Sequence, residues 1–277
     1  MDVAIVTGAN SGIGMLTTLE LLKAGYTVVA TMRNLENQEE LVEHASRLEL
    51  TDRLDVRKLD VTVLKDIEAV KDGVEKKYGK LTVLINNAGY CQGGFLSDLT
   101  TEEWRQQQDV NVHGPFQMTK IFLPLLERAA PANIINISSV SGLFGFPGMS
   151  PYCSSKFALE GLSESLRLEL LPQRIFVSLV EPAAYNTKIW EKGLEKIEST
   201  QLEGAPIKQA VVSYAQQASA ASSDPLEVAR LIVKICRMKA PGFRYPIGKG
   251  ARLLFHAKRW LPWRLLEKIV LRTLIKR

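Results

Sequence analysis

Residues 3–14 read VAIVTGANSGIG, and this stretch decides the fold. A short apolar run ends in a turn with three glycines spaced G-x-x-x-G-x-G, and an amphipathic stretch follows. Such a turn lets the backbone approach a phosphate, and the helix N-terminus offers free N–H groups and a positive dipole end. The spacing differs from the more common G-x-G-x-x-G fingerprint. We expect a dinucleotide pyrophosphate here, held by Gly8, Asn10, Ser11, Gly12, Ile13 and Gly14. The alternative is a glycine-rich turn without a ligand.

The same alternation of apolar runs and amphipathic stretches continues along the chain. The runs expected to be strands are apolar throughout, as in parallel strands covered on both faces: Val3–Val6, Thr27–Thr31, Val56–Leu59, Val83–Ile85, Ile134–Ile137 and Phe176–Val180. The expected helices are Leu16–Lys23, Leu64–Lys77, Phe157–Leu171 and one near Pro225–Met238. This pattern predicts an α/β protein with a single Rossmann-type, doubly wound parallel sheet of about seven strands flanked by helices. Ligands bind such sheets beyond the carboxyl ends of the strands, where the strand order reverses.

Positive charge is concentrated at the C-terminus. The chain has 277 residues with 35 Lys or Arg and 30 Asp or Glu, a net charge of +5. Residues 251–277 hold eight basic residues and one acidic residue, so this tail carries +7 and the first 250 residues carry −2. A basic tail on a nearly neutral body argues against nucleic-acid binding as the general function.

The cysteines and the N-terminus indicate the cellular setting. Cys91, Cys153 and Cys236 form neither a CxxC pair nor a cluster with histidine, which favours reduced thiols in the cytoplasm and predicts no metal site. The first residues lead directly into a strand and lack the regions of a signal peptide, so secretion is not expected. No apolar run is long enough to span a bilayer.

The end of the second expected strand bears on the choice of dinucleotide. NAD sites usually place an acidic residue there for the ribose 2′-hydroxyl, whereas NADP sites place an arginine for the 2′-phosphate. Residues 28–34 read VVATMRN, with no acid and with Arg33 near the end. A guanidinium can bind a phosphate bidentately. We therefore expect NADP(H) to be preferred over NAD(H); a solvated surface arginine is the alternative.

Ser139, Tyr152 and Lys156 form the candidate catalytic group. Tyr152 and Lys156 are four positions apart at the start of an expected helix, so both can point into one pocket. A free tyrosine has a pKa of about 10, and bringing it near 7 requires roughly 4 kcal/mol. Lys156 and the nicotinamide charge together could supply that stabilisation. We expect Tyr152 to exchange a proton and Ser139 to hydrogen-bond the substrate oxygen, while the nicotinamide transfers a hydride.

With these motifs in this order, the chain resembles the short-chain dehydrogenase/reductase family over nearly its whole length. Further matching motifs follow the third and fourth strands and lie in the next helical region: Asp60-Val61, Asn86-Asn87-Ala88-Gly89 and Asp109-Val110-Asn111-Val112. The resemblance implies that Asp60 and Val61 contact the adenine. It implies that Asn87, Ala88 and Gly89 shape the wall beside the adenosine ribose.

The resemblance also assigns the catalytic and nicotinamide ends of the site. It implies a catalytic tetrad of Ser139, Tyr152, Lys156 and Asn111, in which Asn111 holds a water that relays protons to Lys156. Tyr152 and Lys156 would also contact the cofactor, Lys156 through the nicotinamide ribose. Pro182 and Thr187 match the segment that binds the nicotinamide amide, although Ala183 stands where the family usually has glycine. A homodimer is expected.

The sequence is most similar to the estradiol 17-beta-dehydrogenase and retinol dehydrogenase branch, which implies a lipophilic alcohol or carbonyl substrate such as a steroid or retinoid. Apolar residues in segments beside the site would suit such a substrate: Leu143, Phe144, Phe146, Met149, Tyr185 and Trp190. Alternatively, some of them are core or dimer contacts. A catalytically silent dinucleotide sensor and a membrane-peripheral scaffold are the alternative functions.

Two segments are expected to act around this site. We assign residues 1–250 to the catalytic and cofactor-binding domain, with a polar segment near 188–223 as a mobile lid. Residues 251–277 form a basic amphipathic extension, in which Pro262 fits the first turn of a helix with Arg264, Lys268, Arg272 and Lys276 as one basic stripe. This helix is expected to make peripheral contact with a membrane. The alternative is that it packs on its own body or across a dimer.

Overall fold

The strands form one parallel sheet. The structure is a computed structural model that describes residues 1–185, 197, 208–213, 216 and 223–275. In order across the sheet the strands run β3-β2-β1-β4-β5-β6-β7, and every neighbouring pair is parallel. Their bounds are β1 (Val3–Thr7), β2 (Thr27–Met32), β3 (Leu54–Lys58), β4 (Val83–Asn86), β5 (Ala132–Ile137), β6 (Ile175–Pro182) and β7 (Arg244–Ile247). The expectation of a doubly wound Rossmann-type sheet is confirmed.

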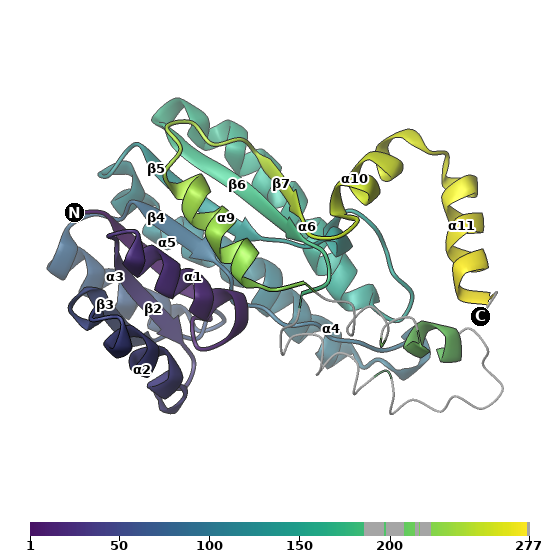
Figure 1. The fold of residues 1–277 in the computed structure, drawn as a ribbon, viewed down its shortest axis with the longest axis horizontal. Helices are drawn as coiled ribbons and strands as arrows, with labels where there is room; N and C mark the ends of the chain where they lie inside the picture. The colour runs from purple at the N-terminus through teal and green to yellow at the C-terminus, as the bar shows by residue number, and fades with distance from the viewer. Residues whose placement is uncertain (186–196, 198–207, 214–215, 217–222, 276–277) are drawn as a thin grey trace.

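Helices cover both faces of the sheet (Figure 1). Their bounds are α1 (Gly12–Lys23), α2 (Glu39–Arg47), α3 (Leu64–Tyr78), α4 (Thr101–Gln108), α5 (Gly114–Glu127), α6 (Ser150–Leu170), α9 (Leu226–Cys236), α10 (Ala251–Trp260) and α11 (Trp263–Ile275). The buried side chains of α1, α2 and α9 form one apolar cluster with the sheet, and those of α3, α5 and α6 form a second. The nearly continuous burial of β1, β2, β4, β5 and β6 follows from this double cover.

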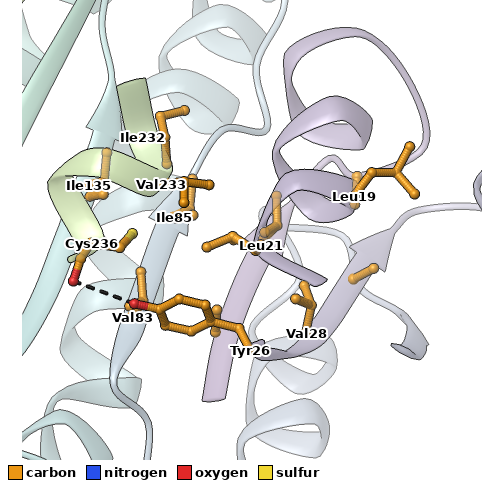
Figure 2. Close-up of a cluster of buried hydrophobic side chains, with 14 of the residues drawn as sticks. Leu19, Leu21, Tyr26, Val28, Val83, Ile85, Ile135, Ile232, Val233 and Cys236 are labelled. Carbon is orange, nitrogen blue, oxygen red and sulfur yellow. Dashed lines mark hydrogen bonds between the residues drawn. The ribbon is translucent and has the colours of Figure 1, made fainter. Parts of the chain in front are cut away.

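The first and last helices of the sheet domain lie side by side. Helices α1 and α9 pack against each other on one face of the sheet. Figure 2 shows this cluster, in which Leu21 and Val83 face Ile232 and Val233. The Tyr26 hydroxyl donates a hydrogen bond to the backbone carbonyl of Cys236 at 3.4 Å. The beginning of the chain is therefore fastened to a segment near its end.

The strand order determines where a ligand can bind. From β1 the chain adds β2 and β3 on one side, and it then returns to add β4 to β7 on the other side. The order therefore reverses between β1 and β4, which pair directly at Ala4–Val83, Ile5–Leu84 and Val6–Ile85. Loops that leave the carboxyl ends of these two strands must separate, and the separation opens a crevice.

The last strand and the C-terminal helices extend this core. β7 is a partly exposed edge strand that contains Pro246, and both features weakened its signal in the sequence. Two helices follow it, α10 and α11, where the sequence predicted one helix after Pro262. Figure 1 shows both extending from the end of the molecule that lies away from the N-terminus. None of the helices in the described part of the chain combines the length and the apolar composition needed to cross a membrane.

Candidate active site

A cavity of about 580 Å³ lies where the strand order reverses. It is lined by every residue that the sequence assigned to the pyrophosphate and adenosine: Gly8, Asn10, Ser11, Gly12, Ile13, Gly14, Arg33, Asp60, Val61, Asn87, Ala88 and Gly89. Its other lining residues were not predicted: Met32, Glu36, Asn37, Glu39, Glu40, Leu59, Tyr90 and Val110. The structure thus brings together loops that follow β1, β2, β3 and β4.

The turn after β1 is built so that only glycine fits at two positions. Gly8 has a φ of +65°, a region that favours glycine. A Cβ on Gly14 would lie 2.2 Å from the Gly8 carbonyl oxygen and 2.4 Å from Asn87 Nδ2. The Asn87 amide donates to the carbonyls of Thr7 and Gly8 at 2.8 and 3.1 Å, so it fastens the turn to the loop after β4. This close packing leaves the start of α1 open toward the cavity and fits a dinucleotide phosphate.

The wall around Arg33 carries both signs of charge. Asn34, the next residue, caps a short 3-10 helix by accepting from Glu36 N at 3.0 Å. Glu36, Glu39 and Glu40 line the same cavity as Arg33. The sequence analysis looked for an acid only at the end of β2 and therefore missed these three. An anionic group would therefore be attracted by Arg33 and repelled by the three glutamates.

Asp60 forms the cavity wall after β3. Its carboxylate accepts hydrogen bonds from the backbone N and the hydroxyl of Thr62 at 2.9 and 2.7 Å. These bonds hold the turn that precedes α3 and leave Asp60 among the lining residues. Val61 lies beside it and is buried. Both residues therefore line the same cavity as the turn after β1.

The four expected catalytic residues lie outside this cavity lining and form a separate buried group. Asn111, Ser139, Tyr152 and Lys156 are between 1% and 7% exposed. Tyr152 and Lys156 occupy the first turns of α6, and Lys156 Nζ lies 5.6 Å from the centre of the Tyr152 ring. Lys156 also donates to the Ile137 carbonyl at the end of β5, at 2.8 Å. The predicted placement on one helix face is confirmed.

Ser139 is held at the end of β5. Its hydroxyl accepts from Ser141 N at 3.1 Å and faces the Pro182 carbonyl at the end of β6, at 3.4 Å. Burial raises the pKa of the Tyr152 hydroxyl, and a hydrogen bond with Ser139 offsets part of that rise. The structure therefore brings Ser139, Tyr152 and Pro182 together at the carboxyl ends of two strands.

Asn111 connects the two parts of the site. It lies in a π-helical turn, Asp109–His113, between α4 and α5. Its amide donates to the Tyr90 carbonyl and the Ser155 hydroxyl, both at 3.1 Å, and its oxygen accepts from Tyr90 N at 3.2 Å. Tyr90 lines the 580 Å³ cavity, and Ser155 directly precedes Lys156 in α6. The side chain therefore fastens the loop after β4 to α6, a role that its place in the sequence did not reveal.

Burial dominates the electrostatics of the catalytic group. It raises the pKa of Tyr152 above its ordinary value, and the bond with Ser139 offsets this only in part. Burial also lowers the pKa of Lys156 to about 8, with Glu160 opposing the change. The sequence analysis expected Lys156 to help lower the pKa of Tyr152 toward 7. The protein groups alone do not do so, because removing both side chains from water penalises both charged forms.

Apolar side chains surround Tyr152. Cys91, Met149, Cys153, Ile197 and Val212 are buried with it, and Phe95 and Phe146 pack against this cluster. Ile197 and Val212 belong to the segment expected to be a lid, most of which lies outside the described residues. Helix 208–213 is fastened by Lys208, whose ammonium lies 3.0 Å from Asp98 Oδ2.

Only part of the expected apolar wall lies at the site. Phe146 and Met149 contact the Tyr152 cluster, whereas Phe144 stacks near Trp263 of α11 with ring centres 6.3 Å apart. Leu143 lines a second cavity, beside α10. Tyr185 follows the alternative that the sequence left open, that of a core contact. It is buried in the cluster of α1 and α9, and its hydroxyl hydrogen-bonds Glu227.

Two further expectations lie outside the described residues, those for Thr187 and Trp190. In the described part of the chain, no three His, Cys, Asp or Glu side chains are grouped as metal ligands would be. The three cysteines are buried and free.

A comparison with models of known protein families shows to which family the chain belongs. Residues 2–198 match the model of the short chain dehydrogenase family. The chain belongs to this family.

Individual relatives match most of the chain. An uncharacterized oxidoreductase of Bacillus subtilis is 41% identical over 276 residues, and the alignment covers 98% of each chain. The expected similarity to the steroid and retinol branch is confirmed by human 17-beta-hydroxysteroid dehydrogenase type 1, 33% identical over 94% of this chain and 79% of that protein. Bovine retinol dehydrogenase 8 is 32% identical over 87% and 79% of the two chains.

Solved structures of short-chain dehydrogenases share the fold. A Streptomyces avermitilis enzyme, 30% identical, superposes with a TM-score of 0.80 over 98% of this chain and 94% of its own. A Burkholderia phymatum enzyme solved with NAD gives 0.80 at 24% identity, over 97% and 95%. Actinorhodin polyketide ketoreductase solved with NADPH gives 0.77 at 29% identity, over 90% and 97%.

Proposed function

We propose that this short-chain dehydrogenase interconverts a lipophilic ketone or aldehyde and the corresponding alcohol with NADP(H), and that residues 1–250 form the catalytic domain. The observation that carries this proposal is the burial of Ser139, Tyr152 and Lys156 together, beside a glycine-walled cavity at the point where the strand order reverses. When bound, the nicotinamide cofactor supplies or accepts the hydride. Gly8 to Gly14 would hold its pyrophosphate, and Asp60 and Val61 its adenine.

The residues around Tyr152 perform the proton transfer. The Ser139 hydroxyl and the Tyr152 hydroxyl converge on one point, so both can hydrogen-bond the substrate oxygen. Tyr152 donates its proton to that oxygen in reduction and accepts it in oxidation. Because burial raises the pKa of Tyr152, the free protein keeps the hydroxyl protonated, which suits the reductive direction. Lys156, with its pKa lowered to about 8, remains largely cationic at neutral pH and stabilises tyrosinate as the proton leaves.

A lipophilic substrate is supported by the walls near Tyr152. Phe95, Phe146 and Met149 offer apolar surface, and Ile197 and Val212 close the cluster from the segment after β6. Pockets of this kind bind flat or long apolar molecules and use a few polar groups for orientation. The names of the steroid and retinol relatives are in keeping with such a substrate.

A preference for NADP(H) is supported by Arg33 and by the lack of an acid at the end of β2. The experiment compares kcat/KM for NADPH and NADH, with a screen of hydrophobic ketones as substrates. Loss of a bidentate phosphate contact costs about 1.5–3 kcal/mol, so Arg33→Asp should abolish or reverse the preference. Arg47→Asp, an exposed change on α2, is the matched control and should leave it intact. Equal use of both cofactors by the wild type would refute the assignment of Arg33.

The same screen tests the reaction itself. Oxidation of NADPH or NADH by the wild-type protein with any of the ketones supports an enzyme. Binding of the dinucleotide with no turnover across the screen would instead indicate a silent dinucleotide sensor.

We further propose that the protein is a homodimer of the cytoplasm that makes peripheral contact with membranes through 251–277. The buried free thiols suit a reducing compartment. Of the α11 side chains that the structure describes, Leu266 alone is buried, and Trp263, Leu265 and Ile269 are exposed among cations. Exposed apolar side chains on a basic helix suit the interface of an anionic membrane.

A further inference from the structure

A cluster of charged side chains lies buried behind the catalytic lysine. Glu160 of α6 accepts hydrogen bonds from the Ser138 hydroxyl and from Arg244 of β7. Arg244 also donates to Glu181 Oε1, at the end of β6, at 2.7 Å. Glu160 is 5% exposed and Glu181 is fully buried. Two carboxyl groups and one guanidinium therefore share an interior site where β5, β6, β7 and α6 meet.

The cluster lies next to two of the catalytic residues, Lys156 and Ser139. Glu160 follows Lys156 by one helical turn, so the two side chains share the buried face of α6. Ser138 directly precedes Ser139, and Glu181 directly precedes Pro182, whose carbonyl faces the Ser139 hydroxyl. Gly142 leaves room for this arrangement, because a Cβ there would lie 2.8 Å from Ser138 Oγ and 2.9 Å from Glu160 Cγ.

The two carboxyl groups have unequal partners. Burial raises the pKa of Glu160, but its two hydrogen-bond donors and the charge of Lys156 oppose that rise and favour the ionised form. Glu181 has one oxygen on Arg244, and its buried Oε2 has no hydrogen-bond partner. Burial and the nearby charge of Glu160 both penalise a negative charge on Glu181 and raise its pKa. The unequal partners therefore favour the proton on Glu181 and the negative charge on Glu160.

We propose that Glu160 is a positioning residue, which supplies the buried negative charge that keeps Lys156 cationic, and that Glu181 and Arg244 hold Glu160 in this state. The inference rests on the proposed function, because it concerns the lysine that stabilises the Tyr152 proton transfer. Without a nearby negative charge, a lysine enclosed at this depth would lose its proton near neutral pH. Glu160 thereby sets the pH range over which the catalytic group works.

The charges that face Lys156 are few. On α6 they are Tyr152 and Glu160, and from the loop after β4 the Cys91 thiol faces it. Burial raises the pKa of Cys91, so that thiol is neutral under ordinary conditions. The pKa of Tyr152 is raised as well. Glu160 is therefore the source of negative charge for Lys156 among the described residues, and it opposes the effect of burial on the pKa of Lys156.

The charges that face the carboxyl pair come from β7 and α6. Arg244 of β7 contacts both carboxylates, and it also lies 3.4 Å from the exposed Glu164 of α6. Burial, followed by the charge of Glu160, raises the pKa of Glu181 to about 7. Burial also raises the pKa of Glu160, against the opposing effects of Ser138, Arg244 and Lys156.

The test measures the titration of Lys156 directly in the full-length protein. Lysine labelled with ¹³C at the ε carbon is followed by NMR from pH 6 to 11, and Lys156→Met identifies the resonance. In Glu160→Gln we expect the pKa of Lys156 to fall by about one pH unit or more, the size expected for losing a close opposite charge. The alkaline limb of kcat/KM should move to lower pH by the same amount. Glu160→Asp, which keeps the charge, should restore most of the shift.

Two control variants separate charge from packing. Glu164→Gln removes an exposed carboxylate that also contacts Arg244 and should leave the titration unchanged. Glu181→Gln imitates a protonated carboxyl group and should move the titration less than Glu160→Gln does. A Lys156 pKa within about 0.3 pH unit of wild type in a folded Glu160→Gln protein would overturn the inference. Circular dichroism establishes that each variant is folded.

A result is available even if Glu160→Gln does not fold. In the wild type, the Lys156 resonance should show a second inflection near pH 7 as the carboxyl pair ionises. Its absence would overturn the inference. The NMR titration needs neither substrate nor cofactor, so a failure of the proposed function would appear separately, as a wild-type protein without turnover.

Discussion

At the scale of single residues, Tyr152 offers a direct test of the chemistry. Its hydroxyl is buried beside Ser139, and Lys156 Nζ lies 5.6 Å from its ring. Tyr152→Phe should reduce kcat by at least about 100-fold, a typical contribution of a positioned acid or base. Cofactor affinity, measured by NADPH fluorescence, should barely change because the ring remains. Tyr26→Phe, which removes a hydroxyl from the opposite end of the sheet domain, is the control. Near-normal turnover in Tyr152→Phe would place the proton transfer elsewhere.

Gly14 tests the phosphate-binding turn at the same scale. A methyl group there would meet the Gly8 carbonyl oxygen at 2.2 Å, and backbone atoms cannot move aside without opening the turn. Gly14→Ala should therefore lose cofactor binding and reduce the free energy of unfolding by about 1–3 kcal/mol. The matched control is Gly161→Ala on the exposed side of α6, where nothing lies within 4 Å. That change should stabilise the protein by about 0.5–1 kcal/mol, because alanine is the better helix former. Thermal unfolding and NADPH titration measure both effects, and unimpaired NADPH binding by Gly14→Ala would contradict this account of the turn.

Many residues that line the cavity could be predicted because they follow strands that the apolar pattern reveals. Arg33 directly follows the buried strand β2, and Asp60 lies two residues after the partly buried strand β3. Glu40 and Tyr90 could not be assigned in this way, because their place on the cavity wall depends on how α2 and the loop after β4 return toward the sheet. Tyr185 could not be assigned to one of its two alternatives, because an aromatic residue beside a site and one in a core have the same local pattern.

At the scale of elements, Asp55 joins β3 to α3. Its carboxylate accepts from Arg57 at 3.0 and 2.8 Å, from the Tyr78 hydroxyl at 2.9 Å and from Lys77 at 3.2 Å. Burial would raise the pKa of Asp55, but these hydrogen bonds outweigh it and hold the pKa below its usual value. Asp55→Asn should reduce the free energy of unfolding by about 1–3 kcal/mol, because the charged partners lose their acceptor. Denaturant unfolding at pH 7 measures the loss.

The pH dependence of the same contact has a definite sign. Because the folded-state pKa of Asp55 is depressed, its contribution is complete above the unfolded value of about 3.9 and is lost as the pH falls through the folded value. The difference between wild type and Asp55→Asn should be constant from pH 5 to 8 and should shrink below pH 4. Asp52→Asn, an exposed change on the turn before β3, should show no such difference. An unchanged difference at pH 3 would exclude this explanation.

Most elements follow from local sequence, but the sequence analysis gave no bounds for β7 or for α2, α4, α5 and α10. The buried strands and α1, α3, α6 and α9 are marked by long apolar or amphipathic runs, so their cores were located within a few residues. β7 is short, partly exposed and contains Pro246, and it becomes a strand only because β6 offers it a paired edge. The separation of α10 from α11 at Pro262 reflects a proline that ends one helix and begins another, which the charge pattern alone does not distinguish.

At the scale of the whole molecule, α11 tests the proposed contact with membranes. A chain ending at Leu261 lacks α11. Among the α11 side chains that the structure describes, Leu266 alone is buried. We expect the full-length protein to co-sediment with anionic vesicles and the shortened chain not to, with the unfolding temperature changed by only a few degrees. The triple variant Arg264→Gln, Lys268→Gln and Arg272→Gln keeps the helix and should bind weakly, and added salt should reproduce that loss. Equal, negligible binding of all three proteins, with the shortened chain unfolding more easily, would indicate a structural helix.

The attachment of α1 to α9 has a consequence for how the protein is made. The hydrogen bond between Tyr26 and Cys236 joins residues 210 positions apart, and α9 packs against the apolar side chains of α1. A ribosome that adds about 5–20 residues per second needs roughly 10–40 s to synthesise this interval. During that time the nascent chain presents an uncovered apolar helix, which is the kind of surface that molecular chaperones bind. Synthesis rate and chaperone supply should therefore govern the yield of this protein in a cell more than they would for a chain whose first helix packs against its sequence neighbours.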